Sequence, residues 1–371
     1  MIYFDNAATT MPKPEAVYRA VDRTMRTCAS LGRSGHPAAQ RASAVAYACR
    51  EAAGRLFSAE PEQVVFTTSA THGLNIAIKT LVKPGDRVVI SGFEHNAVLR
   101  PLYALGAEIV IAGRKLFDPA DTLAAFAAAM TPETKAVVCT HVSNVFGYIL
   151  PVADVAKLCR DRGVPLIVDA AQSAGVLPVS LRDLGAAFIA MPGHKGLYGP
   201  QGTGLLLCGQ MPKPLMEGGT GSQSELWSMP TFLPDAAEAG THNVPGIAGL
   251  LEGIRYVEGR DLRSIARRES GLIRRLAAQL KDVPGLQVFE GPEAVQSGVL
   301  SITAAGRDCE TMAQSLGAAG LAVRAGLHCA PVAHESAGTL HSGTVRLSVS
   351  DFNTPEEVDA AADILRRINT P

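Results

Sequence analysis

Two patterns of apolar and polar positions alternate between about residue 60 and residue 210. Short runs rich in Val, Ile and Leu are separated by longer stretches in which apolar residues recur every three or four positions. Strands that alternate with helices should lie mostly parallel, in one sheet with helices on both faces. The seven predicted strands are 63–67, 87–91, 107–112, 135–140, 164–169, 187–190 and 204–207, and the helices between them are 71–81, 96–105, 121–130 and 153–161.

The pattern differs on either side of this region. Residues 1–12 predict an extended arm, and residues 13–57 predict helix interrupted near 31–37. Residues 211–245 are rich in Gly, Ser and Pro and have little periodicity, which is typical of a long loop that serves a site. Shorter elements follow: an amphipathic stretch over 247–280 broken near Gly259, strands at 287–289, 299–303, 322–324 and 344–349, helices at 309–316 and 354–368, and a loop over 326–343.

These elements predict an α/β protein with two domains. The large domain covers 13–245 and contains the seven-stranded sheet. The smaller α+β domain covers 246–371 and includes the arm 1–12.

The composition narrows the class of protein. The 371 residues are 47% hydrophobic and 19% charged, which fits a globular protein with a large core. A net charge of −1 gives no basic field for nucleic acid, and no apolar run is long enough to span a membrane. The first residues lack the basic and apolar segments of a signal peptide, so we expect a cytoplasmic protein.

Seven cysteines are widely spaced, at 28, 49, 139, 159, 208, 309 and 329. An odd number at such spacings is not a disulfide framework. Most have apolar neighbours and should be small buried hydrophobic residues. Cys329 differs because it follows His328 in a predicted loop.

Polar residues follow several of the predicted strands. Parallel sheets bind ligands beyond the carboxyl ends of their strands, so these residues should lie together. Thr68–Gly73 opens a helix with small hydroxyl residues, a pattern suited to an anion. His95, Asn144 and Asp169 follow later strands, and Lys195 lies in the glycine-rich run 191–204, where backbone can approach a ligand closely. Taken singly, Lys195 could be a surface lysine and Asp169 a helix cap.

Together these residues suit pyridoxal phosphate. The cofactor needs a lysine for its aldehyde, an anion site for its phosphate and a carboxylate at its ring nitrogen. Lys195, the helix start near Thr71 and Asp169 are placed to supply them.

The chain also resembles a known family, the class V aminotransferases, and within it the cysteine desulfurases and selenocysteine lyases. The matching segments occur in family order along nearly the whole chain: Tyr3–Thr10, Glu94–His95, Thr140–Gly147, Val168–Gln172, Gly193–Lys195, Gly240–Thr241 and Val323–Ala330. The resemblance implies fold type I of the pyridoxal phosphate-dependent transferases.

The resemblance implies a role for each matching cofactor residue. Lys195 would hold the cofactor and move the proton on the substrate Cα, Asp169 would pair with the ring nitrogen, and His95 would stack on the ring. The remaining contacts would come from Gln172 and Asn144 at the phenolic oxygen, from Ala70, Thr71 and His194 at the phosphate, and from Thr241 at the phosphate of a neighbouring subunit in a homodimer.

Further residues are implied for the substrate. Cys329 would attack the sulfur of L-cysteine, with its pKa lowered by a flanking histidine or by the cofactor, and would then pass its persulfide to an acceptor protein. Arg346 would bind the substrate carboxylate, with weaker claims for Arg324 and Asn6. Arg33 and His36 resemble an entrance motif.

Three positions depart from the family pattern. Pro192 stands where many relatives have serine and removes one usual phosphate contact. His72 stands where relatives carry glutamate, and Asn96 stands where a second histidine is often found. These departures leave the preferred substrate and the sulfur acceptor open.

Other functions also remain open. The leading hypothesis is a cysteine desulfurase that forms L-alanine and a persulfide on Cys329. A selenocysteine lyase, or an aminotransferase, β-lyase or epimerase in which Cys329 is incidental, would use the same cofactor. A sulfur-relay scaffold without turnover is a further alternative, as is a metal-binding module built on His328, Cys329, His334 and His341.

Overall fold

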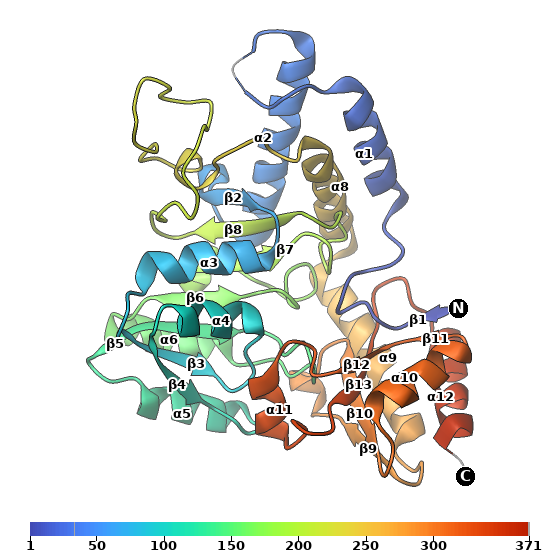
Figure 1. The fold of residues 1–371 in the computed structure, drawn as a ribbon. Coiled ribbons are helices and arrows are strands. Elements are labelled where there is room, and N and C mark those ends of the chain that lie inside the picture. Colours follow the sequence, from blue (N-terminus) through green and yellow to red (C-terminus); the bar gives the residue numbers. More distant parts are fainter. Residues whose placement is uncertain (33, 370–371) are drawn as a thin grey trace.

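A seven-stranded sheet lies at the centre of the larger half of the molecule in the computed structural model, which describes residues 1–32 and 34–369 (Figure 1). Only β8 runs antiparallel to its neighbours, and every other adjacent pair is parallel. The strand order is β2 (Val64–Thr67), β8 (Gly204–Cys208), β7 (Phe188–Pro192), β6 (Leu166–Asp169), β5 (Thr134–Thr140), β3 (Arg87–Ser91) and β4 (Glu108–Ala112). The predicted mostly parallel sheet is confirmed, and each strand overlaps its predicted range.

Successive side chains of each strand point to opposite faces of the sheet, and both faces are buried. Val88 and Ile90 pack with α3 (Ala70–Leu81) and α4 (Asn96–Ala104), which lie in front of the sheet in Figure 1. Val89 points to the opposite face. Residues of that face pack with α2 (Pro37–Phe57), α5 (Pro119–Ala129), α6 (Val152–Arg162), α7 (Leu181–Leu184) and α8 (Val244–Arg260).

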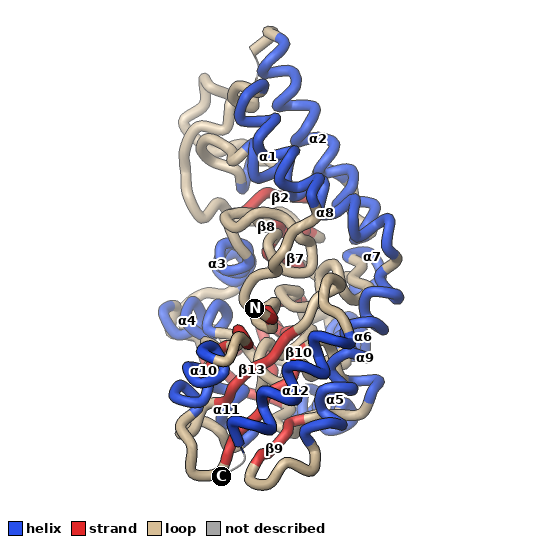
Figure 2. Tube along the Cα trace, turned by 90° about the vertical axis from the view of Figure 1, so that its right-hand side faces the viewer, coloured by secondary structure: helices blue, strands red, loops and turns tan. Residues whose placement is uncertain are grey.

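Helices α1, α2 and α8 stack at one end of the molecule (Figure 2). Helix α1 (Glu15–Thr27) packs along α8, and Ile247, Leu250 and Ile254 of α8 belong to the core of the large sheet. Helix α8 therefore packs with the large half although most of its residues follow residue 245. The division of the chain at 245 and 246 stays a prediction.

A four-stranded antiparallel sheet forms the smaller half. Its order is β12 (Arg324–Gly326), β13 (Thr344–Ser348), β10 (Val299–Ala304) and β9 (Leu286–Phe289). Residues of α9 (Leu262–Leu280), α10 (Cys309–Ala318) and α12 (Pro355–Asn369) share its apolar core. The arm joins this half through β1 (Ile2–Tyr3), which pairs in parallel with β11 (Leu321–Ala322).

The prediction of a continuous loop over 326–343 was wrong. Helix α11 (Pro331–Ala337) lies within it, with Pro331 in its first turn and Gly338 in the left-handed conformation at its end. Pro is well tolerated where a helix begins, and Gly where it ends. The helix is short enough that no apolar period marks it.

The loop between β8 and α8 is predicted correctly. It contains one short 3₁₀ turn, η2 (Asp235–Ala237); two others, η1 (Pro61–Gln63) and η3 (Glu293–Val295), lie elsewhere. Glu238 fastens this loop to the sheet edge, because its carboxylate accepts from Phe66 N at 2.6 Å, from Arg50 Nη2 at 2.6 Å and contacts His242 Nε2 at 2.7 Å.

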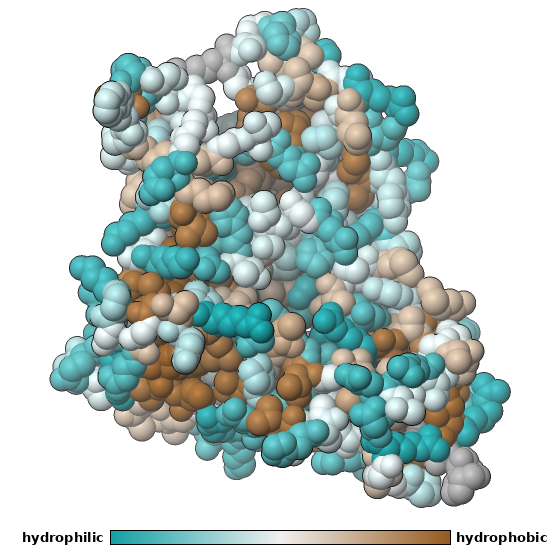
Figure 3. Space-filling view, in the orientation of Figure 1, coloured by the Kyte–Doolittle hydropathy of each residue, from teal (hydrophilic) through white to brown (hydrophobic). Residues whose placement is uncertain are grey.

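One edge of the large sheet is only partly covered. Ile109 and Ile111 of the edge strand β4 are half-buried, and Tyr103 at the end of α4 is exposed. Apolar side chains accordingly gather over α4 and β4 at the lower left of Figure 3. Among the residues described, no helix has the length and apolar character needed to cross a membrane.

Candidate active site

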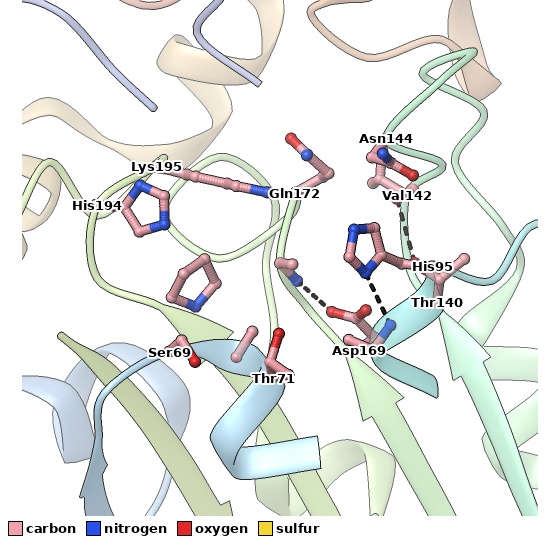
Figure 4. Close-up of a pocket in the computed structure, with 14 residues that line it drawn as sticks. Ser69, Thr71, His95, Thr140, Val142, Asn144, Asp169, Gln172, His194 and Lys195 are labelled. Atoms are coloured by element: carbon pink, nitrogen blue, oxygen red, sulfur yellow. Dashed lines mark hydrogen bonds between the residues drawn. The ribbon is translucent and has the colours of Figure 1, made fainter. Parts of the chain in front are cut away.

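A cavity of about 100 Å³ lies at the carboxyl ends of the central strands. Its walls come from the segments that follow β2, β3, β5, β6 and β7, as the strand-end rule predicts. Figure 4 shows Ser69, Thr71 and His194 on one side of this site cavity and His95 and Asn144 on the other.

The start of α3 forms one wall of the site cavity. Ser69 caps this helix, since its hydroxyl accepts from His72 N at 3.2 Å. The N–H groups that follow at Ala70 and Thr71 begin a 12-residue helix, whose dipole favours an anion at this end. Pro192 also lines the site cavity and offers neither an N–H nor a hydroxyl group.

His194 lies beside this helix start. Its Nδ1 is buried and has no hydrogen-bond partner in the described part of the chain. Burial, followed by the charge of Lys195, lowers the pKa of His194 to about 4, so the ring is neutral at pH 7. A buried, unpaired ring nitrogen beside a helix N-terminus is available to an anionic ligand.

Asp169 ends β6 and is 3% exposed. Its Oδ1 accepts from Ala171 N at 2.8 Å, and no cation lies within ion-pair distance among the residues that the structure describes. Burial raises the pKa of this carboxyl, while Lys195 acts in the opposite direction. A buried carboxyl without a cationic partner is suited to a protonated ring nitrogen.

His95 caps α4 on the wall of the site cavity opposite Thr71 and His194. Its Nδ1 accepts from Ala97 N at 3.0 Å, so the hydrogen of the neutral ring lies on Nε2. That nitrogen points into the site cavity in Figure 4. Burial and the charge of Lys195 lower the pKa of His95 to about 4.

Glu94, the residue before His95, ties two strand ends together, a role the sequence reasoning missed. This fully buried carboxyl accepts from Thr140 N at 2.6 Å and from Ser91 Oγ at 2.5 Å. It thereby joins the end of β3 to the end of β5. Burial raises the pKa of Glu94 to about 8.

Lys195 reaches across the site cavity toward Gln172 (Figure 4). Burial, together with the nearby Arg346, lowers the pKa of its ammonium to about 8. The peptide before it is held by the arm, because the His194 carbonyl accepts from Thr10 N at 3.1 Å and from Lys13 Nζ at 2.7 Å. The sequence reasoning also missed Lys13, and no local pattern in the arm indicates this contact.

Two amide side chains complete the walls. Gln172 donates through Nε2 to Ala7 O at 3.0 Å, and Asn144 donates through Nδ2 to His328 O at 2.8 Å. Both side chains line the site cavity and are fixed by backbone from distant segments.

Arg346 lies on β13 and is 2% exposed. Its Nη1 donates to Asn144 O at 2.9 Å and its Nη2 to Asp5 Oδ1 at 2.8 Å. Arg324 lies opposite it on β12 and is exposed. Asn6 instead faces the small sheet, since its Nδ2 donates to Ser348 O at 3.0 Å and to Asn353 Oδ1 at 3.2 Å. The assignment of Asn6 to the substrate stays a prediction.

Cys329 is exposed and lies in a neighbouring groove of about 350 Å³. Thr71, His95 and Ala97 line both this groove and the site cavity. Cys329 has a left-handed backbone, with φ of 57°, and its carbonyl accepts from Asn96 N at 2.7 Å. Asn96 thus fixes the cysteine loop through its backbone.

A positive charge on His328 beside the thiol was a wrong expectation. The ring of His328 is buried, with Nε2 at 3.2 Å from the Thr344 carbonyl. Burial, with a smaller effect of Arg346, lowers its pKa to about 2. His328 is therefore neutral and cannot stabilise a thiolate at Cys329 by charge.

The remaining predicted residues lie elsewhere. Thr241 is exposed and lines a separate cavity of about 230 Å³, together with His72. His36 caps α2, accepting from Ala39 N at 3.3 Å, while Arg33 lies outside the described residues. No three His, Cys, Asp or Glu side chains of residues 1–32 and 34–369 form a group that could hold a metal ion.

Comparison with known proteins extends over the whole chain. Residues 2–361 match the family model for aminotransferase class-V. The chain is 33% identical to "Probable cysteine desulfurase 1" of Mycobacterium leprae, over 99% of this chain and 62% of that protein. It is 32% identical to "Probable cysteine desulfurase" of Methanothermobacter thermautotrophicus, over 99% and 94%.

Solved structures give the same result. The apo structure of cysteine desulfurase from Thermococcus onnurineus superposes with a TM-score of 0.91 at 31% identity, covering 99% of this chain and 94% of that one. The cysteine desulfurase CsdA of Escherichia coli gives 0.87 at 27% identity, with the same coverage. The chain spans 62% of the Mycobacterium leprae protein and 55% of a relative from Mycolicibacterium paratuberculosis, so these two relatives are considerably longer.

Proposed function

Because the chain belongs to the aminotransferase class-V family, we propose that it is a pyridoxal phosphate-dependent cysteine desulfurase. It converts L-cysteine to L-alanine and leaves a persulfide on Cys329 for transfer to an acceptor protein. The observation that carries the proposal is one arrangement: Lys195, Asp169 and His95 line a cavity whose wall is shared with the groove of Cys329.

The site cavity has the groups that this cofactor requires. The start of α3 with Thr71, and the unpaired Nδ1 of His194, suit its phosphate. Asp169 suits its ring nitrogen, and His95 lies on the wall opposite Thr71 and His194. When bound, pyridoxal phosphate supplies an electron sink for a carbanion at the substrate Cα. Because Pro192 has no hydrogen-bond donor, the helix N–H groups and His194 would bind the phosphate.

Lys195 and His95 are suited to proton transfer. A lysine pKa of about 8 leaves a useful fraction of neutral amine near pH 7, as a general base requires. His95 is neutral and holds a hydrogen on the nitrogen that faces the site cavity. Arg346 binds the substrate carboxylate, a task that suits a planar guanidinium.

Cys329 takes the sulfur. Its thiolate attacks the sulfur of the substrate, an S–S bond forms and the substrate's Cβ–S bond breaks. The carbon keeps the electron pair of the broken bond and gains a proton, so L-cysteine and one thiol give L-alanine and one persulfide. Exposure of Cys329 leaves the new persulfide accessible to a thiol of an acceptor.

The test is product analysis on protein loaded with pyridoxal phosphate. With L-cysteine and a reductant, we expect alanine and sulfide in equal amounts. Cys329→Ala should lower this rate more than about 100-fold, because the nucleophile is lost. Cys28→Ala, at another cysteine that is not fully buried, should leave it unchanged. Absence of alanine from the wild type, or full activity of Cys329→Ala, would overturn the proposal.

Two further parts of the proposal rest on the family resemblance: the homodimer, with Thr241 serving a neighbouring subunit, and the acceptor protein. The cytoplasmic location rests on the sequence of the first residues. Turnover of L-selenocysteine by Cys329→Ala, without turnover of L-cysteine, would favour a selenocysteine lyase instead.

A further inference from the structure

The guanidinium of Arg346 already has an anionic partner. Asp5 Oδ1 accepts from Nη2 at 2.8 Å, and the two side chains form an ion pair in which Arg346 is 2% and Asp5 is 21% exposed. Burial lowers the pKa of Arg346, and Asp5 is the main group that counteracts this. The substrate carboxylate assigned to Arg346 therefore meets a guanidinium that is already neutralised.

Arg346 still has hydrogen-bond donors that no group of the described chain accepts from. Its Nη1 is held by Asn144 O at 2.9 Å, while Nε is buried and finds no acceptor in the described chain. A guanidinium carries five N–H bonds, so two contacts leave most of them free. An unpaired buried donor of this kind indicates a ligand rather than a finished structural ion pair.

The backbone at Asp5 is held in place, which keeps its carboxylate close to Arg346. Asp5 is bridged in the backbone to Ser348 of β13, and the next residue, Asn6, is hydrogen-bonded to Ser348 and Asn353. The segment just before Asp5 pairs with β11. Two carboxylates must therefore share the surroundings of Arg346 once substrate is bound.

Counting charges shows what this arrangement prefers. Arg346 and Arg324 contribute two positive charges on adjacent strands, and Asp5 contributes one negative charge. Together they leave one net positive charge, which a single α-carboxylate balances, and the opposite charges of the nearby Lys195 and Asp169 do not change this sum. A ligand with a second carboxylate would leave one net negative charge at this site.

We propose that Asp5 sets both the affinity and the charge selectivity of the substrate site, by occupying Arg346 and disfavouring amino acids with an anionic side chain. This inference rests on the proposed function, because it takes Arg346 as the carboxylate site. Asp5 acts through Arg346 and is a specificity-determining residue, not a catalytic one.

The test compares Asp5→Asn with wild type, both loaded with pyridoxal phosphate. Asparagine keeps an oxygen that can accept from Arg346 and removes only the charge. Dissociation constants for L-alanine and L-aspartate are read from the change in cofactor absorbance. We expect Asp5→Asn to bind L-alanine roughly 3-fold to 100-fold more tightly, the range for a unit charge about 6 Å away between water-like and protein-surface screening. The gain for L-aspartate should be larger.

Two variants serve as controls. Asp5→Glu keeps the charge and should retain the preference for L-alanine over L-aspartate. Asp22→Asn removes an exposed carboxylate on α1 and should change neither constant. A merely structural Asp5 predicts the opposite result for Asp5→Asn, with weaker binding of both amino acids and a lower melting temperature.

Unchanged or weaker binding of both amino acids to Asp5→Asn would overturn the inference. If the wild type binds amino acids but makes no alanine from L-cysteine, the proposed desulfurase function fails, while the ratio of dissociation constants still decides the role of Asp5. If neither protein binds either amino acid, both proposals fail.

Discussion

Among single residues, Glu94 has an unusual protonation state beside the site cavity. Its pKa is raised from 4.5 to about 8 by burial, with Asp169 contributing in the same direction. The folded protein therefore keeps a proton on this carboxyl that the unfolded chain releases above about pH 4.5. Stability from Glu94 is fully present below pH 4.5 and is lost as the pH rises through about 8.

Glu94→Gln should remove this dependence. Glutamine has nearly the same shape and cannot ionise, so the free energy of unfolding of wild type should fall relative to the variant by up to about 1.4 kcal/mol per pH unit across this range. Urea unfolding of the cofactor-free proteins at several pH values between 5 and 9 measures the difference. Curves that stay parallel would contradict the assignment, and Glu62→Gln, at a surface position, is the control.

How far single residues could be predicted depends on where their contacts come from. Lys195, Asp169 and His95 follow buried strands, and parallel strands bring such residues to one edge whatever lies between them. Asp5 and Lys13 act through contacts with Arg346 and with the peptide before Lys195, far along the chain. No local pattern encodes such a contact.

Burial explains the residue-level error at His328. A histidine next to a cysteine suggests a charged neighbour if both are exposed. In the structure the backbone turns through the left-handed region at His328 and Cys329, which exposes the thiol and buries the ring. The environment of a side chain, and hence its charge, follows from this backbone turn, which the residue types alone do not specify.

At the scale of elements, one buried carboxylate attaches the long loop between β8 and α8 to neighbouring elements. Glu238 is 7% exposed and binds Arg50, His242 and the backbone of Phe66. The Arg50 guanidinium also lies 4.2 Å from the centre of the Phe66 ring. Glu238 thus joins the loop that carries Thr241 to both β2 and α2.

Glu238→Ala should be strongly destabilising, because it leaves the charge of Arg50 buried without an anionic partner. We expect the free energy of unfolding to fall by about 3–5 kcal/mol. Glu258→Ala, which breaks the exposed pair with Arg55, should cost less than about 1 kcal/mol. Urea denaturation measures both, and equal losses in the two variants would show that the buried cluster is not the anchor.

Elements were predicted well where they were long and buried. The seven strands of the large sheet are continuous apolar runs, and the structure has all of them. Helix α11 was missed because its seven residues follow the geometry of Pro331 and Gly338 rather than an apolar period. Short elements of this kind depend on the packing around them, which a single sequence does not display.

For the whole molecule, buried histidines set the limit of stability in acid. His141, His328 and His334 lie in the interior, and burial lowers their pKa values to about 4, about 2 and about 4. In the unfolded chain these histidines bind protons when the pH is below their ordinary pKa of 6.5. Stability from these groups is present above pH 6.5 and is lost as the pH falls from 6.5 toward about 4.

We therefore expect the free energy of unfolding to be highest near pH 6.5, because below this pH the loss from three buried histidines outweighs the gain from Glu94, and above it the loss from Glu94 continues. In acid the decrease should be up to about 1.4 kcal/mol per pH unit for each buried histidine. His334→Gln should reduce the slope between pH 4.5 and 6.5, whereas His341→Gln, at an exposed position, should not. Unfolding curves with the same slope in both variants would contradict this account.

The pairing of β1 with β11 also has a consequence for how the protein is made. Ile2 and Tyr3 bond to Leu321 and Ala322, so the arm cannot reach its place until the ribosome has synthesised most of the chain. Asp5 and Lys13 arrive with the arm, and only then do Arg346 and the peptide before Lys195 gain these partners. A growing chain can form the large sheet early, yet Arg346 and the peptide before Lys195 gain the contacts of the arm only in one late docking step.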